Sequence, residues 1–167
     1  MKAARPLKTN ACRLLDSLSI AYELRAYEVD PHDLSAISVA RKIGLPPEQV
    51  FKTLLTESTA REHVFAVVPG DRELDLKKLA AAAGTRKLDL ATLKEVEPLT
   101  GYVRGGVTVL AAKKAFPAFA DETIELFDLV SVSAGQRGLQ LLLAPADYLH
   151  ATAATLADLT RAGRSAL

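Results

Sequence analysis

Cysteine is nearly absent from this chain, and its scarcity limits the possible chemistry. The 167 residues include one cysteine, Cys12. A single cysteine cannot form an intrachain disulfide, which favours a reducing compartment. Because Cys12 lies in the amphipathic helical stretch from Ala11 to Leu15, we expect it to be a small buried hydrophobic side chain rather than a nucleophile.

Net charge and long apolar runs are also missing. The chain has 21 basic and 20 acidic residues, a formal charge of +1. A protein that coats nucleic acid through many phosphate contacts would be far more basic, so any RNA contact must be local, around one pocket. No apolar run approaches the roughly 20 residues that span a bilayer, and the N-terminus lacks the hydrophobic region of a signal peptide. We therefore expect a cytoplasmic protein with no membrane partner.

The remaining composition is that of an ordinary globular protein, with 49% hydrophobic and 25% charged residues. We expect one domain over residues 1–167. Apolar spacing and breaker residues predict helices over 10–18, 35–43, 75–84, 91–96 and 145–156. They predict strands over 21–29, 50–56, 63–68, 87–90, 107–110, 118–121, 129–133 and 139–143. Helices and strands do not alternate strictly, which favours an α+β fold with a mixed, curved sheet.

The most informative residue is Lys52, within the predicted strand 50–56. Successive side chains of a strand point to opposite faces, so Lys52 shares its face with Val50 and Leu54. An ammonium on an apolar face loses hydration that burial does not return unless an anion or a carbonyl meets it. Lys52 therefore either extends its head to solvent or awaits a ligand, and the strand alone does not decide between the two.

Two segments carry backbone features suited to ligands. In Gly101-Tyr102-Val103-Arg104-Gly105-Gly106, the adjacent glycines allow backbone amides to approach a ligand, and Tyr102 offers a ring or a hydroxyl. In Ser133-Ala134-Gly135-Gln136-Arg137-Gly138, successive amides can bind an anion or a carbonyl, and Arg137 suits a phosphate. Taken alone, either segment is better explained as an ordinary hairpin loop.

Cofactor and metal chemistry receive little support from the sequence. The three histidines, His32, His63 and His150, show no ligand spacing and have no partner cysteines. No GxGxxG, Walker loop or G-x-S-x-G pattern occurs. We expect neither a metal nor a cofactor.

Taken in order, these segments resemble the YbaK/EbsC family, whose members hydrolyse mischarged aminoacyl-tRNA in trans and are similar to the editing domain inserted in bacterial prolyl-tRNA synthetases. The resemblance extends from about residue 9 to 161. It rests on Tyr27-Glu28-x-Asp30-Pro31, Gly44-Leu45-x-x-x-Gln49-Val50-Phe51-Lys52-Thr53-Leu54, Leu74-Asp75-Leu76-Lys77-Lys78, Gly101-Tyr102-x-x-Gly105-Gly106 and Ser133-x-Gly135-x-Arg137-Gly138-Leu139.

The resemblance implies a mixed, partly closed sheet around a pocket that receives the acceptor end of an aminoacyl-tRNA. Lys52 matches the pocket lysine, taken as the catalytic group, with Tyr27 and Thr53 beside it. The walls around the aminoacyl group are implied to come from the two glycine-containing segments, at Gly101, Tyr102, Gly105, Gly106, Ser133, Gly135 and Arg137. A prolyl-tRNA synthetase is an implied partner.

Three positions depart from the branch of the family that is specific for cysteinyl-tRNA. Val107-Thr108-Val109 replaces x-Ser-Pro after the glycine pair, Ala134 replaces a glycine, and Gln140 replaces an aspartate. The leading expectation is hydrolysis of a mischarged tRNA such as cysteinyl-tRNA(Pro). The alternatives are a binding module that retains the pocket without turnover, and a hydrolase of a small aminoacyl-like ester.

Overall fold

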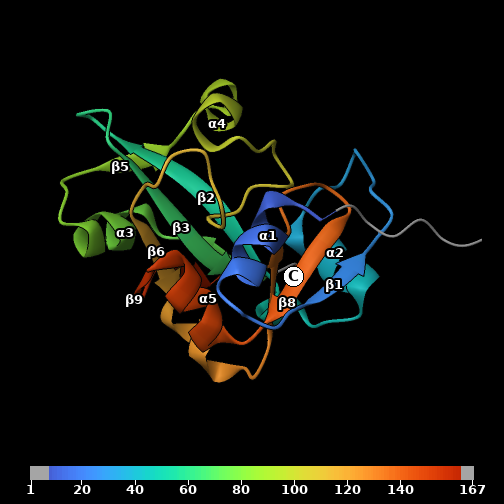
Figure 1. Cartoon of the computed structure of the whole chain (residues 1–167). Helices are drawn as coiled ribbons and strands as arrows, with labels where there is room; N and C mark the ends of the chain where they lie inside the picture. The colour runs from blue at the N-terminus through green and yellow to red at the C-terminus, as the bar shows by residue number, and fades with distance from the viewer. Residues whose placement is uncertain (1–7, 163–167) are drawn as a thin grey trace, which may run out of the picture.

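The computed structural model describes residues 8–162, which form five α-helices, two short 3-10 helices and ten strands (Figure 1). The helices are α1 (Asn10–Ser17), α2 (Ala36–Ile43), η1 (Pro47–Gln49), α3 (Leu76–Ala83), α4 (Leu93–Thr100), η2 (Glu122–Leu126) and α5 (Pro145–Thr152). The strands are β1 (Glu23–Ala26), β2 (Phe51–Ser58), β3 (His63–Pro69), β4 (Arg72–Leu74), β5 (Leu88–Leu90), β6 (Ala118–Asp121), β7 (Val130–Ser133), β8 (Leu139–Leu143), β9 (Thr155–Ala157) and β10 (Thr160–Ala162). Within this range, no helix has the length and apolar character needed to cross a membrane.

The strands form three sheets. The largest has the order β5-β2-β3-β6-β9, with antiparallel pairs on the β5 side and parallel pairs on the β9 side. A second sheet has the order β1-β8-β7, and β4 pairs with β10. One bridge between Val50 and Ser131 joins the first two sheets without closing them. The predicted α+β fold with a mixed sheet is confirmed.

Strand β3 lies at the centre of the main sheet and is apolar on both faces. Val64, Ala66 and Val68 pack against α3, which contributes Leu79. Val67 points the other way, into the largest core cluster with residues of α1, β8 and α5. A strand buried on both faces reads as a continuous apolar run rather than as an alternating one, as the sequence from 64 to 68 does.

Polar side chains cap the starts of α2 and α3, and glycines end them. Ser35 caps α2 by accepting a hydrogen bond from the Ser38 amide, and Asp75 caps α3 through the amides of Lys77 and Lys78. Gly84 ends α3 with a φ of +73°, a left-handed conformation that glycine adopts without strain.

Several predicted boundaries are wrong. The helix predicted at 91–96 is α4, at 93–100, and residues 107–110 form no strand. The last helix ends at Thr152, so Leu156 belongs to β9 rather than to a helical face. Strand β9 pairs with β6 and β10 pairs with β4, both far away in the sequence. Such pairings cannot be read from local spacing, which is why these short strands were not predicted.

The buried carboxylate of Asp121 fastens the C-terminal segment to the main sheet, which generates a test of the fold. Its Oδ1 accepts the Leu159 amide at 2.9 Å, and its Oδ2 accepts the Thr123 hydroxyl at 2.6 Å. We expect Asp121→Ala to lower the free energy of unfolding by about 1–3 kcal/mol because the buried Leu159 amide loses its partner. Urea unfolding measures the loss. Asp128→Ala removes an exposed carboxylate and serves as the control, and equal effects of the two changes would contradict the role of Asp121.

Candidate active site

Half of strand β2 has an unpaired outer edge. On one side, β2 pairs with β3 over residues 51–57, whereas on the other side β5 pairs only with residues 56–58. The Val50 carbonyl accepts the Gly70 amide on the β3 side, and the Leu55 carbonyl accepts the Ala91 amide on the β5 side. Alternation then directs the backbone N–H and C=O of Thr53 outward, between the Val50–Ser131 bridge to β7 and the stretch paired with β5. This stretch is a site at which a ligand can bind to backbone groups.

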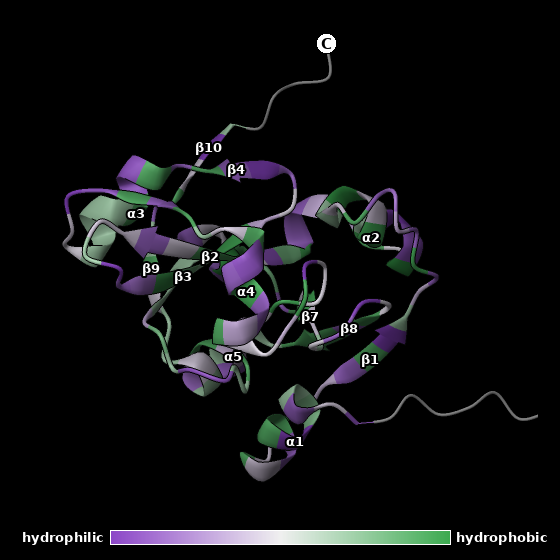
Figure 2. Ribbon diagram, turned by 90° about the horizontal axis from the view of Figure 1, so that it is seen from above, coloured by the Kyte–Doolittle hydropathy of each residue, from purple (hydrophilic) through white to green (hydrophobic). Residues whose placement is uncertain are grey.

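A cavity of about 730 Å³ lies along this edge. One wall comes from the start of α2 and the turn between β3 and β4, and another from β5, α4 and the loop after α4. The lining carries polar and charged groups from Ser35, Lys52, Thr53, Asp71, Arg72, Glu73, Arg104, Gly105, Ser133 and Gln140. In the view from above, α4 lies over the region of β2, with α2 at one side (Figure 2).

Lys52 is a half-buried residue that lines this cavity. The predicted alternation is present, since Phe51, Thr53 and Leu55 are buried and Lys52 and Leu54 are partly exposed. Burial lowers the pKa of the Lys52 ammonium, while the charges of Glu73 and Asp71 act in the opposite direction. Among residues 8–162, no carboxylate oxygen lies within 4.0 Å of the ammonium. Its charge is therefore available to a ligand.

Beneath the strand, two hydroxyl groups meet in the protein interior. The hydroxyls of Thr53 and Tyr148 are buried, and neither has a hydrogen bond of good geometry within the described part of the chain. Burial raises the pKa of the Tyr148 hydroxyl, and the nearby Thr53 hydroxyl opposes that rise. Tyr148 therefore stays protonated.

The two glycine-containing segments pack against each other. A Cβ on Gly135 would lie 2.9 Å from Cε1 of Tyr102, and one on Gly106 would lie 3.0 Å from Cα of Gln136. Tyr102 is buried, and its hydroxyl donates to the Leu110 carbonyl at 2.6 Å. These glycines therefore allow the two segments to approach closely. Of the residues in the two segments, Arg104, Gly105 and Ser133 line the cavity.

The other predicted site residues lie behind that lining. Nε of Arg137 donates to the Arg104 carbonyl at 2.7 Å and so ties one segment to the other. The Tyr27 amide donates to the Gly138 carbonyl at 2.9 Å. Gly101 ends α4 with a φ of +81°. The structure thus brings Lys52, Thr53, Gly105 and Ser133 together and places Tyr27, Gly101, Tyr102, Gly106, Gly135 and Arg137 outside the lining of the main cavity.

Sequence reasoning missed several polar residues of the cavity, including Asp71, Arg72 and Glu73 at the start of β4, and also Arg104 and Gln140. Arg104 is exposed and lines the cavity, yet nothing in its glycine-rich surroundings marked it apart from its neighbours. Gln140 appeared only as a departure from a family pattern, whereas its buried side chain lines the cavity and its Oε1 accepts the Ser131 hydroxyl at 2.7 Å. The available signal was its position in β8, where the pairing with β7 places Gln140 opposite Ser133.

Fold and site together define an α+β domain whose cavity offers the cationic side chains of Lys52, Arg72 and Arg104 beside an unpaired strand edge. This arrangement is suited to an oxygen-rich or anionic group. The family model described as "Aminoacyl-tRNA editing domain" matches residues 30–151. The chain belongs to this family.

Named relatives agree with that assignment. The chain is 40% identical over 153 residues to "Putative Cys-tRNA(Pro)/Cys-tRNA(Cys) deacylase EbsC" of Enterococcus faecalis, covering 92% of this chain and 93% of the relative. It is 32% identical over 101 residues to "Multifunctional Ser/Thr-tRNA deacylase ProXp-y" of Escherichia coli, covering 60% of each chain. A solved structure described as "a putative trans-editing enzyme for prolyl tRNA synthetase" matches with a TM-score of 0.77 and 26% identity, over 93% of this chain and 99% of that one. The resemblance seen in the sequence is confirmed.

The contact between the glycine segments can be tested by adding one methyl group. Gly135 has a φ of +98° and faces the Tyr102 ring, whereas Gly84 has a φ of +73° and open space around it. Gly135→Ala and Gly84→Ala each incur left-handed strain of about 1–2 kcal/mol. Only Gly135→Ala also overpacks the interface, which adds about 1–3 kcal/mol. Urea unfolding of both variants measures the difference, and equal losses would contradict the packing role of Gly135.

Proposed function

We propose that this protein is a free-standing aminoacyl-tRNA deacylase, which hydrolyses the ester between a wrongly attached small amino acid and the 3′ end of a tRNA such as tRNA(Pro). The observation that carries the proposal is the half-buried ammonium of Lys52 beside the free edge of β2, within a cavity of about 730 Å³. The deacylase names of the relatives support it. Residues 1–167 act as one domain.

The chemistry of the substrate fits what the cavity offers. An aminoacyl ester is already activated, so a site need only orient it, stabilise the developing oxyanion and admit a nucleophile. The Lys52 ammonium and the Thr53 and Gly105 backbone amides supply positive potential for the oxyanion. Of the described residues, those that line the cavity include no histidine and no cysteine. The Ser35, Thr53 and Ser133 hydroxyls that line it therefore have no histidine to activate them, and the proposed nucleophile is water or a thiol of the substrate itself.

In this proposal, the site residues predicted from the sequence have two roles. Lys52, Thr53, Gly105 and Ser133 contact the aminoacyl end of the substrate. The others shape that surface: Tyr27, Gly101, Tyr102, Gly106, Gly135 and Arg137. Apolar side chains on the cavity walls limit the size of the amino acid, where one methylene changes discrimination by about 1–3 kcal/mol.

Two exposed arginines at the cavity, Arg72 and Arg104, suit the phosphates of the acceptor end. This local basic character agrees with a net charge of only +1. Charged tRNA is the substrate, a prolyl-tRNA synthetase is the proposed partner, and the cytoplasm, where charged tRNA is used, is the proposed location.

A panel of mischarged tRNAs tests the activity directly. We expect deacylation of at least one small-amino-acid species. Lys52→Ala should lower kcat/KM by about 10²–10³-fold, the usual effect of removing one oxyanion-stabilising group. Lys77→Ala removes an exposed lysine of α3 outside the cavity and should leave the rate unchanged.

Each result that contradicts this expectation indicates a different alternative. Full activity of Lys52→Ala would refute the role of Lys52. Saturable binding of a non-hydrolysable aminoacyl-adenosine analogue, without turnover of any tRNA, would indicate a binding module. Cleavage of small aminoacyl esters that uncharged tRNA does not inhibit would indicate a small-molecule hydrolase.

The lowered pKa of Lys52 makes the activity sensitive to alkaline pH. Because burial favours the neutral amine, the ammonium loses its proton below the usual lysine value of about 10.4. If the charged form stabilises the oxyanion, enzymatic kcat/KM falls as pH rises through the lowered pKa. Lys52→Arg, which keeps its charge throughout, should lack that alkaline limb whatever its absolute rate. Rates corrected for spontaneous ester hydrolysis measure this, and identical profiles for the two proteins would contradict it.

A further inference from the structure

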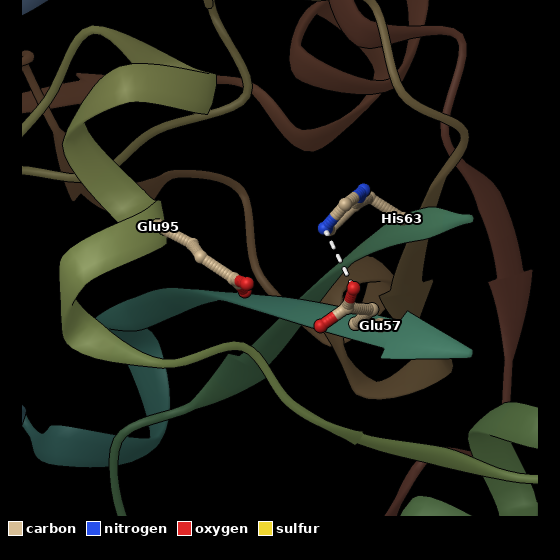
Figure 3. A group of neighbouring side chains, drawn as sticks. All are labelled: Glu57, His63 and Glu95. Atoms are coloured by element: carbon tan, nitrogen blue, oxygen red, sulfur yellow. Dashed lines mark ion pairs between the residues drawn. The ribbon is translucent and has the colours of Figure 1, made fainter. Parts of the chain in front are cut away.

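A second cluster of polar side chains lies outside the cavity, at the far end of the β2–β3 hairpin. Glu57 and His63 are directly opposite each other in the register of this hairpin. Glu95 extends toward them from the first turn of α4 (Figure 3). One ligand atom from each of the three residues lies within 4.8 Å of the others. Hairpin and helix thus converge on one point from opposite sides.

Burial makes this cluster unusual. Nε2 of His63 and Oε2 of Glu95 are enclosed, and neither has a hydrogen-bond partner among residues 8–162. The imidazole is 11% exposed, and its ring lies 5.0 Å from that of Phe116, which fixes its orientation. Nε2 of His63 is 3.9 Å from Oε1 of Glu57, too far for a hydrogen bond. Buried polar atoms that lack a partner require an explanation, and an ion is one.

Charge favours a cation at this point. The cluster itself contains two carboxylates, and among residues 8–162 the guanidinium of Arg61 lies within 4.0 Å of both of them. Its Nε is 3.5 Å from Oε1 of Glu57 and its Nη2 is 3.6 Å from Oε1 of Glu95. The Arg61 side chain is 79% exposed, so it screens the carboxylates from outside and leaves the enclosed atoms unpaired. With a neutral imidazole the group carries a net charge of −1.

We propose that Glu57, His63 and Glu95 bind a divalent first-row transition metal ion, for which Zn²⁺ is the appropriate probe. One imidazole nitrogen with two carboxylate oxygens is a donor set that such ions accept, with bonds of about 2.0–2.2 Å. Neighbouring donors around a tetrahedral ion then lie about 3.4 Å apart. Nε2 of His63 and Oε1 of Glu57, now 3.9 Å apart, need to move only slightly closer to reach this spacing. The flexible side chain of Glu95 can cover the longer distance to the other two.

The ion would connect α4 to the main sheet. Leu93 and Val96, on either side of Glu95 in the sequence, line the cavity along β2. Fixing the first turn of α4 to the hairpin would therefore hold one cavity wall in place. The inference does not depend on the reaction assigned to that cavity, because the three ligands lie outside its lining.

Titration calorimetry with ZnCl₂ tests the site, using untagged protein first stripped with a chelator. We expect saturable binding of one ion and a higher melting temperature with the ion bound. Glu95→Gln and His63→Phe should each weaken binding at least about tenfold, since even supporting residues of metal sites have effects of this size. His63→Phe keeps an aromatic ring against Phe116.

Matched variants sharpen the result. Glu97→Gln changes an exposed carboxylate of the same helix, and His150→Phe changes an exposed histidine, so neither should alter binding. Arg61→Ala should strengthen binding, because it removes the competing cation. MgCl₂ should bind far more weakly, since imidazole is a poor ligand for Mg²⁺.

Three outcomes would overturn the proposal. The first is the absence of saturable Zn²⁺ binding, which would assign the enclosed atoms to water. The second is binding that Glu95→Gln leaves unchanged, a result that stands even if His63→Phe fails to fold. The third is an equal response to Mg²⁺, which would show that carboxylate charge acts without the imidazole.

Discussion

The site depends on a missing strand. Strand β5 pairs with only the last three residues of β2, so the preceding residues keep one unpaired edge in the middle of an otherwise hydrogen-bonded sheet. Backbone groups buried without partners are costly, and an edge of this kind persists only where water or a ligand reaches it. The cavity along β2 meets that requirement. It also explains why Lys52 is tolerated on a partly buried strand face, because the same opening gives its ammonium access to solvent or to an anion.

The wall opposite the edge is built by close packing rather than by long side chains. Two contacts bring the backbone segments within van der Waals distance. Gly135 packs against the Tyr102 ring, and Gly106 packs against the backbone of Gln136. Neither glycine can gain a methyl group without displacing its neighbour. The contact fixes where Gly105 presents its backbone to the cavity. Preorganisation of this kind places amides before a reaction begins, which is the condition under which they stabilise an oxyanion most effectively.

Local features were predictable from the sequence, and long-range ones were not. The face occupied by Lys52 and the caps at Ser35 and Asp75 follow from spacings of two to four residues, and the structure has them. The family resemblance brought Thr53 and Ser133 to the same pocket as Lys52, which spacing alone does not do. The remaining features combine segments far apart in the chain. Glu57, His63 and Glu95 have no ligand spacing in the sequence, and only the hairpin register together with the docking of α4 brings them together.

The residue at position 140 affects the electrostatics of the cavity. A carboxylate there would add a third negative group to the cavity lining, after Asp71 and Glu73, whereas Gln140 is neutral and its oxygen is occupied by the Ser131 hydroxyl. The carboxylates that act on Lys52 are instead those of Glu73 and Asp71, in and beside the strand that follows β3. The interior of the cavity is therefore more positive than it would be with aspartate at position 140. Under the proposed function, such a cavity favours a developing oxyanion, and the carboxylates of Asp71 and Glu73, which also line the cavity, remain for the α-ammonium of the amino acid.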